Sequence, residues 1–194
     1  MLPNDELSDK PIRLRNACIF YLGHIPTFLD IQLTKTTGTP PTSPASFYDI
    51  FERGIDPDVD DPEKCHQHSE IPDEWPPLED IIAYQDRVRE RLRSLYDASE
   101  GGQKGLYIPR NVGRAIWLGF EHELMHIETL LYMMLQSSKT LPPPDVPRPD
   151  FEKLAREAAE AAVENEWFNV PAQSIGIGMD DPEDGTDTDV HFGW

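Results

Sequence analysis

Residues 111–138, NVGRAIWLGFEHELMHIETLLYMMLQSS, contain no proline and consist largely of residues that favour helices. Large apolar residues recur here at steps of three and four, the spacing of one buried helical face. They are Ile116, Trp117, Phe120, Leu124, Ile127, Leu131 and Met134. Pro109 and Asn111 suit a helix start, because proline fits the first turn and asparagine caps free N–H groups. The sequence therefore predicts a long helix with this apolar face in the core.

His122 and His126 lie one turn apart in this predicted helix, so both imidazoles project from the same side and can bind one cation. The letters HELMH also fit the H-E-x-x-H pattern of zinc metalloproteases, in which Glu123 would be the general base. The glycine and third histidine that metzincins add are missing. A thermolysin-like enzyme would need a later acidic ligand, for which Glu152 and Glu157 are candidates. The pattern predicts a metal site and keeps the metalloprotease as an alternative.

A third ligand has to come from another segment. Glu128 lies two residues after His126, about 200° around the helix at roughly 100° per residue, so it points away from both histidines. His24 is the better candidate, because it lies in the strongly apolar run FYLGHIPTFLDIQL, where a polar ring needs a buried partner. A core histidine bonded to a backbone carbonyl is the alternative interpretation of His24.

These segments together resemble a known family. YLGHIPTF, residues 21–28, followed by HELMHIE, residues 122–128, is similar to the DinB-like domain of ergothioneine-forming sulfoxide synthases, especially the fungal fusion proteins. The resemblance implies a mainly α fold, a DinB-like helical bundle, in which His24, His122 and His126 hold a non-haem iron(II). It also implies an oxidoreductase that uses O2 to join hercynine to cysteine or γ-glutamylcysteine, giving a sulfoxide.

The resemblance also divides the chain. Residues 1–141 correspond to the metal-binding bundle, and residues 142–194 to a linker, an acidic helix and the start of a second domain related to sulfatase-modifying enzymes. In the family that second domain supplies a tyrosine proton donor and much of the substrate pocket. The polar residues 1–11 do not provide the first bundle helix, and residues 169–194 predict only a short β fringe. We expect a fragment that is weakly active or inactive alone and can self-associate through exposed bundle surface.

Residues 78–98 predict an amphipathic helix that is rich in arginine although the chain is acidic. Its apolar stripe consists of Ile81, Ile82, Val88, Leu92 and Leu95. By the resemblance, arginines of this helix bind the carboxylates of the thiol substrate. Arg87 and Arg91, one turn apart, are the predicted pair, because guanidinium groups bind carboxylates through two parallel hydrogen bonds. Ordinary surface ion pairs are the alternative.

Three further segments have a clear character. Residues 12–33 predict a buried helix, and residues 150–167 predict an acidic helix capped by Asp150. Residues 34–77 are too proline-rich and polar for a long regular element and predict only a short turn at residues 46–54. The core is therefore expected to consist of helices.

The composition excludes several classes of partner. Seventeen basic against 36 acidic residues give a formal charge of −19, which argues against binding to nucleic acid or to an anionic membrane. The two cysteines, Cys18 and Cys65, form no disulfide framework. No apolar run is long enough to span a membrane, and the N-terminus is too polar for a signal peptide. We therefore expect a cytoplasmic protein with small-molecule substrates.

The sequence leaves some assignments open. Cys65, His66 and His68 are residue types that bind metals, but a polar, irregular segment is a poor context for a site, so no role is assigned to them. Three imidazoles alone do not distinguish iron from zinc. The alternative to an enzyme is a non-catalytic interaction module of the same fold, and no catalytic residue beyond the ligands is predicted.

Overall fold

The computed structural model describes residues 2–13, 15–52, 55–57, 65–67, 72–100, 108–143 and 145–177. Within them, residues 2–140 form one compact unit and residues 141–177 belong to a second. The elements in chain order are η1 (Asn4–Glu6), α1 (Cys18–Thr37), α2 (Phe47–Phe51), β1 (Ile55–Pro57), β2 (Cys65–Gln67), α3 (Leu78–Glu100), α4 (Arg110–Leu135) and α5 (Phe151–Glu160). The predicted mainly α fold is confirmed. None of the described helices has both the length and the apolar content needed to cross a membrane.

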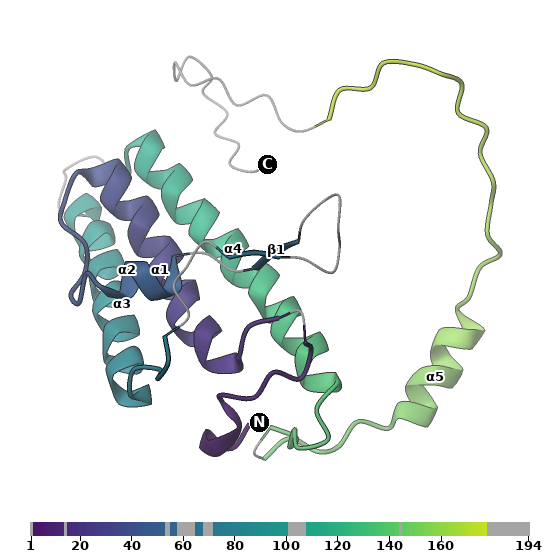
Figure 1. Cartoon of the computed structure of the whole chain (residues 1–194). Coiled ribbons are helices and arrows are strands. Elements are labelled where there is room, and N and C mark those ends of the chain that lie inside the picture. Colours follow the sequence, from purple (N-terminus) through teal and green to yellow (C-terminus); the bar gives the residue numbers. More distant parts are fainter. Residues whose placement is uncertain are drawn as a thin grey trace. The chain divides into compact units, whose positions relative to one another are not determined.

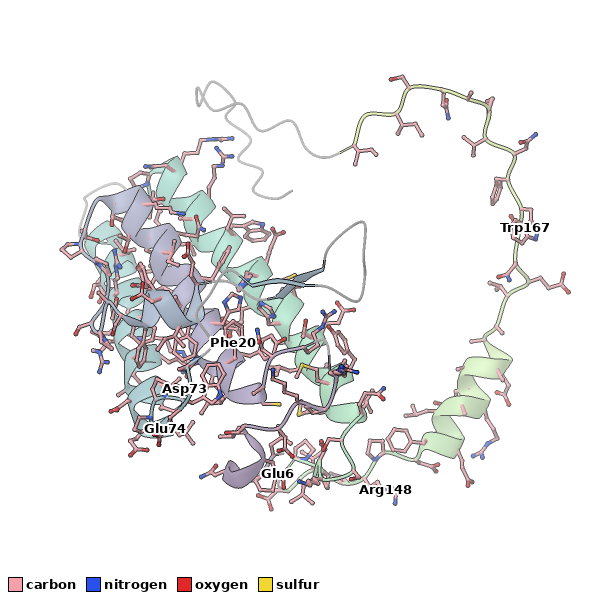
Figure 2. All side chains as sticks on the ribbon, viewed as in Figure 1. Glu6, Phe20, Asp73, Glu74, Arg148 and Trp167 are labelled. Atoms are coloured by element: carbon pink, nitrogen blue, oxygen red, sulfur yellow. The ribbon has the colours of Figure 1, made fainter. Side chains whose placement is uncertain are left out.

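Helix α1 is the centre of the first unit, because α2, α3 and α4 all pack against it. Figure 1 shows α1 between α3 and α4, and Figure 2 shows the side chain of Phe20 inside this group of helices. The core consists of Ala17, Cys18, Ile19, Phe20, Tyr21, Phe47, Phe51, Ile81, Tyr84, Val88 and Met133. The helix ends at Gly38, whose φ of 68° suits glycine and whose N–H bonds to the carbonyl of Thr34 at 3.0 Å. A buried helix here was predicted, although α1 begins and ends later than residues 12–33.

Two glycines let neighbouring elements approach α1 closely. A Cβ atom added to Gly23 would lie 2.6 Å from three ring atoms of Phe51 in α2. A Cβ atom added to Gly119 in α4 would lie 2.6 Å from Cδ1 of Leu29 in α1. Ordinary van der Waals contact between carbon atoms needs about 3.5–4.0 Å, so a side chain at Gly23 would overlap the ring of Phe51 and one at Gly119 would require Leu29 to shift.

The structure corrects the predicted buried face of α4. Most of the large apolar side chains expected in the core are exposed; Phe120 and Leu131, for example, are 50% and 52% exposed. The exposed ones are Trp117, Phe120, Leu124, Ile127 and Leu131, which we call the α4 stripe. The buried side consists of Val112, Ala115, Gly119, His122, His126, Thr129 and Met133. This side carries small residues, which allow the backbone of α4 to lie close to α1, whereas the bulkier stripe does not.

The start of α4 also differs from the expectation. The helix begins at Arg110, and the residue before it is Pro109, whose carbonyl accepts the N–H of Gly113 at 2.9 Å. Asn111 therefore lies inside the first turn, and the capping position is occupied by Pro109, which forms no side-chain cap. The proline was a sound signal for this helix start, and the asparagine was not.

Helix α3 packs on the opposite side of α1 from α4 (Figure 1). Its range, Leu78–Glu100, is close to the predicted residues 78–98. Ile81 and Val88 of the predicted stripe are buried, as expected, but Ile82 is 39% exposed and does not belong to it. Tyr84, one turn from both Ile81 and Val88, is fully buried instead and packs against Phe47 of α2. The apolar stripe of α3 therefore includes a tyrosine, which the sequence analysis did not assign to it because that analysis counted aliphatic residues.

The segment between α1 and α3 contains α2, where a short turn was predicted, and a pair of strands that was not predicted. Strands β1 and β2 pair antiparallel, with Ile55 opposite Gln67 and Pro57 opposite Cys65. Helix α2 matters most for the core, because Phe47 and Phe51 are both buried.

The second unit contains α5 and an extended chain. The predicted cap is confirmed: Oδ1 of Asp150 accepts the N–H of Lys153 at 2.9 Å. The helix ends at Glu160 rather than near Trp167, and all its side chains are exposed. Trp167 itself is 94% exposed (Figure 2). Residues 161–177 include no strand, and residues 178–194 lie outside the described residues, so most of the predicted β fringe is untested.

The close contact at Gly23 yields a stability prediction. Gly23→Ala should lower the free energy of unfolding by about 1–3 kcal/mol, because the new methyl group overlaps the buried ring of Phe51. The gain of roughly 1 kcal/mol from helix propensity does not offset this overlap. Urea unfolding followed by circular dichroism measures the difference. Gly176→Ala is the matched control, since nothing lies within 4 Å of its added Cβ. A Gly23→Ala variant as stable as the parent chain would contradict the packing described here.

Candidate metal centre

Three imidazoles from two helices converge in the first unit. Nε2 of His122 lies 3.1 Å from Nε2 of His24 and 3.0 Å from Nε2 of His126. The side chains are almost completely removed from solvent, with 4%, 9% and 8% exposure for His24, His122 and His126. Within the described residues, this is the one group of three or more His, Cys, Asp or Glu side chains with ligand atoms close enough to hold one metal ion. The structure thus brings together the three residues that the sequence analysis singled out.

A backbone carbonyl fixes the tautomer of His24. Nδ1 of His24 lies 2.7 Å from the carbonyl oxygen of Phe51, which can only accept a hydrogen bond. Nδ1 therefore carries the proton, and in the neutral ring Nε2 carries a lone pair that points towards His122. A metal-bound histidine commonly donates its other N–H to a carbonyl in this way. Both interpretations of His24 from the sequence, the carbonyl contact and the metal ligand, are compatible in one side chain.

Aromatic side chains of α1 hold two of the rings in place. Phe28 stacks on His122 with ring centroids 3.8 Å apart and planes inclined by 13°. Phe20 stacks on His24 with centroids 4.9 Å apart and planes inclined by 18°. The Nδ1 atoms of His122 and His126 are buried and have no hydrogen-bond partner among the described residues, so stacking is what orients the ring of His122. The sequence analysis did not identify these phenylalanines as part of the site, although both lie in the same apolar run as His24.

Burial keeps all three imidazoles neutral. It lowers the pKa of His122 to about 2, and the nearby His24 and His126 lower it further in the same direction. It also lowers the pKa of His126 to about 4, with smaller contributions from His24 and from the charge of Arg15. The pKa of His24 is lowered by burial as well, and its hydrogen bond to Phe51 opposes this shift. Neutral rings are the form that binds a metal, so no proton has to be removed near pH 7.

The acidic residues considered as ligands or bases are all exposed. Glu123 and Glu128 are exposed on α4. Glu152 and Glu157 are exposed on α5, which belongs to the second unit. The third group beside the histidine pair is therefore His24 and not a carboxylate, which gives no support to the metalloprotease alternative.

The side chains of Cys65 and His66, and the whole of His68, lie outside the part of the chain that the structure describes. The backbones of Cys65 and His66 lie in β2. No role is assigned to these three residues.

Arg91 already has a carboxylate partner within the chain. Its Nη1 lies 2.6 Å from Oδ1 of Asp30, a side chain with no solvent exposure. Asp30 also accepts hydrogen bonds from the N–H and hydroxyl of Thr42 and from the hydroxyl of Tyr48. Arg91 further donates to Thr34 at 2.9 Å. A substrate carboxylate could use Arg91 only by displacing Asp30, because one guanidinium fork serves one carboxylate at full strength.

Arg87 makes a different contact. Its Nε donates to the carbonyl of Ser43 at 2.9 Å, and the contact is exposed. The assignment of Arg87 and Arg91 to substrate binding therefore stays a prediction. For Arg91 it requires that the ion pair with Asp30 breaks when the substrate binds. The sequence did hold a signal for the internal pair: Asp30 lies in an apolar run, where an acid needs a cationic partner.

Known proteins resemble the sequence of this chain. Residues 1–130 match the DinB superfamily. The whole chain is 70% identical to "Ergothioneine biosynthesis protein 1" of Neurospora crassa, and 92% of it is 35% identical to the protein of the same name from Schizosaccharomyces pombe. In both cases the match covers 22% of the relative, so the chain spans about a fifth of the length of these relatives. With a family match over most of its length and a unit of packed helices to go with it, the chain belongs to the DinB superfamily.

Proposed function

We propose that this chain is the metal-binding part of an iron(II)-dependent sulfoxide synthase in ergothioneine biosynthesis. The convergence of His24, His122 and His126 is the observation that carries the proposal. The two relatives are named for ergothioneine biosynthesis, which supports the pathway. The resemblance of YLGHIPTF and HELMHIE to the synthase family supplies the reaction: O2-dependent joining of hercynine to cysteine or γ-glutamylcysteine.

The spacing of the nitrogens is compatible with one metal ion held by the three rings, because neighbouring nitrogens about 2.1 Å from a metal lie roughly 3.0–3.4 Å apart. The Nε2 spacings of 3.1 Å and 3.0 Å are of this size, and all three ligand atoms lie within 4.8 Å of one another. Three imidazoles do not distinguish iron(II) from zinc, so the choice of iron(II) rests on the resemblance to the synthase family.

Three protein ligands suit the proposed reaction. When bound, iron(II) would offer open positions at which a thiolate and O2 can react, which a site closed by four protein ligands would not. The chain's own residues prepare this centre before the metal binds. The carbonyl of Phe51 holds the lone pair of His24 towards the other rings, and the ring of Phe28 shields His122 from water. Little reorganisation is then needed on binding, which favours affinity.

The setting of the reaction follows from charge and cysteine chemistry. A formal charge of −19 disfavours nucleic acid and anionic lipid as partners. Cys18, the cysteine whose side chain is described, is a free, buried thiol. We place the reaction in the cytoplasm with small-molecule substrates, and we assign any self-association to the α4 stripe.

Metal binding is the first test. Chain loaded with iron(II) under anaerobic conditions should retain one equivalent, measured as iron that co-elutes with protein on gel filtration. His24→Ala, His122→Ala and His126→Ala should each abolish retention, because two ligands do not hold the ion against exchange. His66→Ala is the matched control and should retain the full equivalent. Equal losses from all four variants would show that the binding is nonspecific and the site wrong.

The depressed histidine pKa values predict how the metal-free chain responds to acid. In the unfolded state these rings titrate near pH 6.5, whereas in the fold His122 and His126 stay neutral to about pH 2 and pH 4. Below about pH 6.5 the unfolded state therefore binds more protons, and the stability present above that pH is lost as the pH falls. Each ring contributes a decline of up to roughly 1.4 kcal/mol per pH unit.

Urea unfolding between about pH 7 and pH 5 measures this decline. His126→Gln, which cannot titrate, should show a visibly shallower pH dependence than the parent chain. The same slope in both proteins would mean that His126 is not buried in its neutral form.

Catalysis by the chain alone is the third test. We expect at most traces of sulfoxide, because the chain spans 22% of its relatives and the resemblance places one wall of the pocket in a further domain. Misplacing a substrate by about 1 Å can cost roughly a hundredfold in rate. Purified chain is incubated with iron(II), ascorbate, hercynine, cysteine and air, and the product is sought by mass spectrometry. Robust turnover would show that the 194 residues suffice.

A further inference from the structure

Asp30 of α1 is a carboxylate without solvent exposure, and hydrogen-bond donors surround both of its oxygens. Oδ1 accepts from Nη1 of Arg91 at 2.6 Å and from the hydroxyl of Thr42. Oδ2 accepts from the N–H of Thr42 at 2.8 Å and from the hydroxyl of Tyr48 at 2.7 Å. A carboxylate offers about four acceptor sites, so all of them are used here. Such a fully paired buried network is rigid, because breaking any one bond leaves a buried polar group without a partner.

Tyr48 connects this network to α2. Its hydroxyl gives its only proton to Asp30, because a carboxylate can only accept. The same hydroxyl lies 3.1 Å from Oγ1 of Thr34, which therefore donates to Tyr48. Nη1 of Arg91 in turn donates to Oγ1 of Thr34 at 2.9 Å. The direction of each of these bonds is thereby fixed, and the tyrosine of α2 has one defined position against α1.

The last residue of α2 is the one that contacts the metal centre. Phe51 follows Tyr48 by three residues, and its carbonyl accepts the N–H at Nδ1 of His24 at 2.7 Å. Helix α2 is thus bonded to α1 at Asp30 and at His24, six residues apart and about 9 Å along the helix axis at 1.5 Å per residue (Figure 1). A helix of five residues held at two such points cannot tilt without lengthening one of the two bonds.

We propose that Asp30 is a positioning residue of the metal centre and acts through its bond from Tyr48. By holding α2 in place, this bond keeps the carbonyl of Phe51 on Nδ1 of His24, and the lone pair at Nε2 stays directed towards the other rings. The inference rests on the proposed function and deepens it, since it assigns this task to a side chain that touches neither metal nor substrate. The guanidinium of Arg91 neutralises the buried carboxylate, which would otherwise be costly to keep charged.

The first readout is the ring proton of His24 in the metal-free chain. With isotopically labelled histidine, NMR spectra that correlate ring protons with ring nitrogens show which nitrogen carries the proton, and His24→Gln identifies the signal. In the parent chain Nδ1 should carry it and exchange it slowly with water. Tyr48→Phe should make this exchange roughly tenfold faster, the effect of losing one hydrogen bond to a charged group. Asp30→Asn should have at least the same effect, because an amide replaces one acceptor oxygen with a donor.

The second readout is the affinity for iron(II), measured anaerobically against a competing chelator. Tyr48→Phe should raise the dissociation constant roughly tenfold, the usual effect of loosening a group that orients a metal ligand. Tyr132→Phe is the matched control: this tyrosine lies on α4 with two of the histidines, and its hydroxyl accepts from Nε of Arg15 at 2.9 Å. It loses a bond to a charged group outside the Asp30 network, so both readouts should stay at the parent values even where its stability in urea falls.

The double variant Asp30→Asn with Tyr48→Phe tests the route of the effect. Its changes in exchange and in iron affinity should not exceed those of Asp30→Asn alone, because Tyr48 acts through Asp30 and the two losses are not independent. Additive losses would overturn this route. Circular dichroism shows whether each variant is folded, and the comparison of Tyr48→Phe with Tyr132→Phe decides the matter if Asp30→Asn is not.

The outcomes separate this inference from the proposed function. Parent-like exchange in Tyr48→Phe would overturn the inference, as would equal changes in Tyr132→Phe. Faster exchange with unchanged iron affinity would also overturn it, because the network would then not serve the metal centre. A parent chain that retains no iron(II) would overturn the proposed function, and the exchange at His24 would then decide alone whether Asp30 positions this ring.

Discussion

The candidate metal centre depends on the position of one proton. A neutral imidazole carries a single N–H. In His24 this N–H is at Nδ1, where it donates to the carbonyl oxygen of Phe51. Nε2 is then committed as a lone pair, in the direction of the other two rings. The acceptor belongs to α2, a helix of five residues in an otherwise irregular segment. The position of α2 is fixed by the buried ring of Phe51, which packs against Gly23, the residue just before His24. The short helix is therefore as important for the site as the two long ones.

Local spacing was enough to predict the pair on α4 but not the side that α4 buries. His122 and His126 are one turn apart in any helix, so their shared direction follows from the sequence. Which side faces the core depends on α1, and two apolar sides were available. The side of α4 that faces the core carries Ala115 and Gly119, whose small size lets the backbones of α4 and α1 approach closely. The same side places both histidines in the core. Counting large apolar residues favours the wrong side, because close packing selects small residues here.

For a related reason, the sequence does not show whether Arg87 or Arg91 is available to bind a substrate. Position on a helix does not reveal which guanidinium has an internal partner, since Asp30 and Arg91 are far apart in sequence and meet only when α1 packs on α3. The acid in an apolar run was the available signal, and it was more informative than the arginine spacing.

The two sides of α4 differ in chemistry, and this separation has a physical consequence. Phe120 and Leu124 each lie two residues from His122, about 200° around the helix at roughly 100° per residue, so stripe and ligands face opposite ways. A run of large apolar groups exposed along several turns is unfavourable in water, and a surface of this kind is typical of interaction sites. A covering segment would contact the stripe without occupying the space between α1 and α4. A segment that covers the stripe therefore need not contact His122 or His126, which lie on the opposite side of the helix.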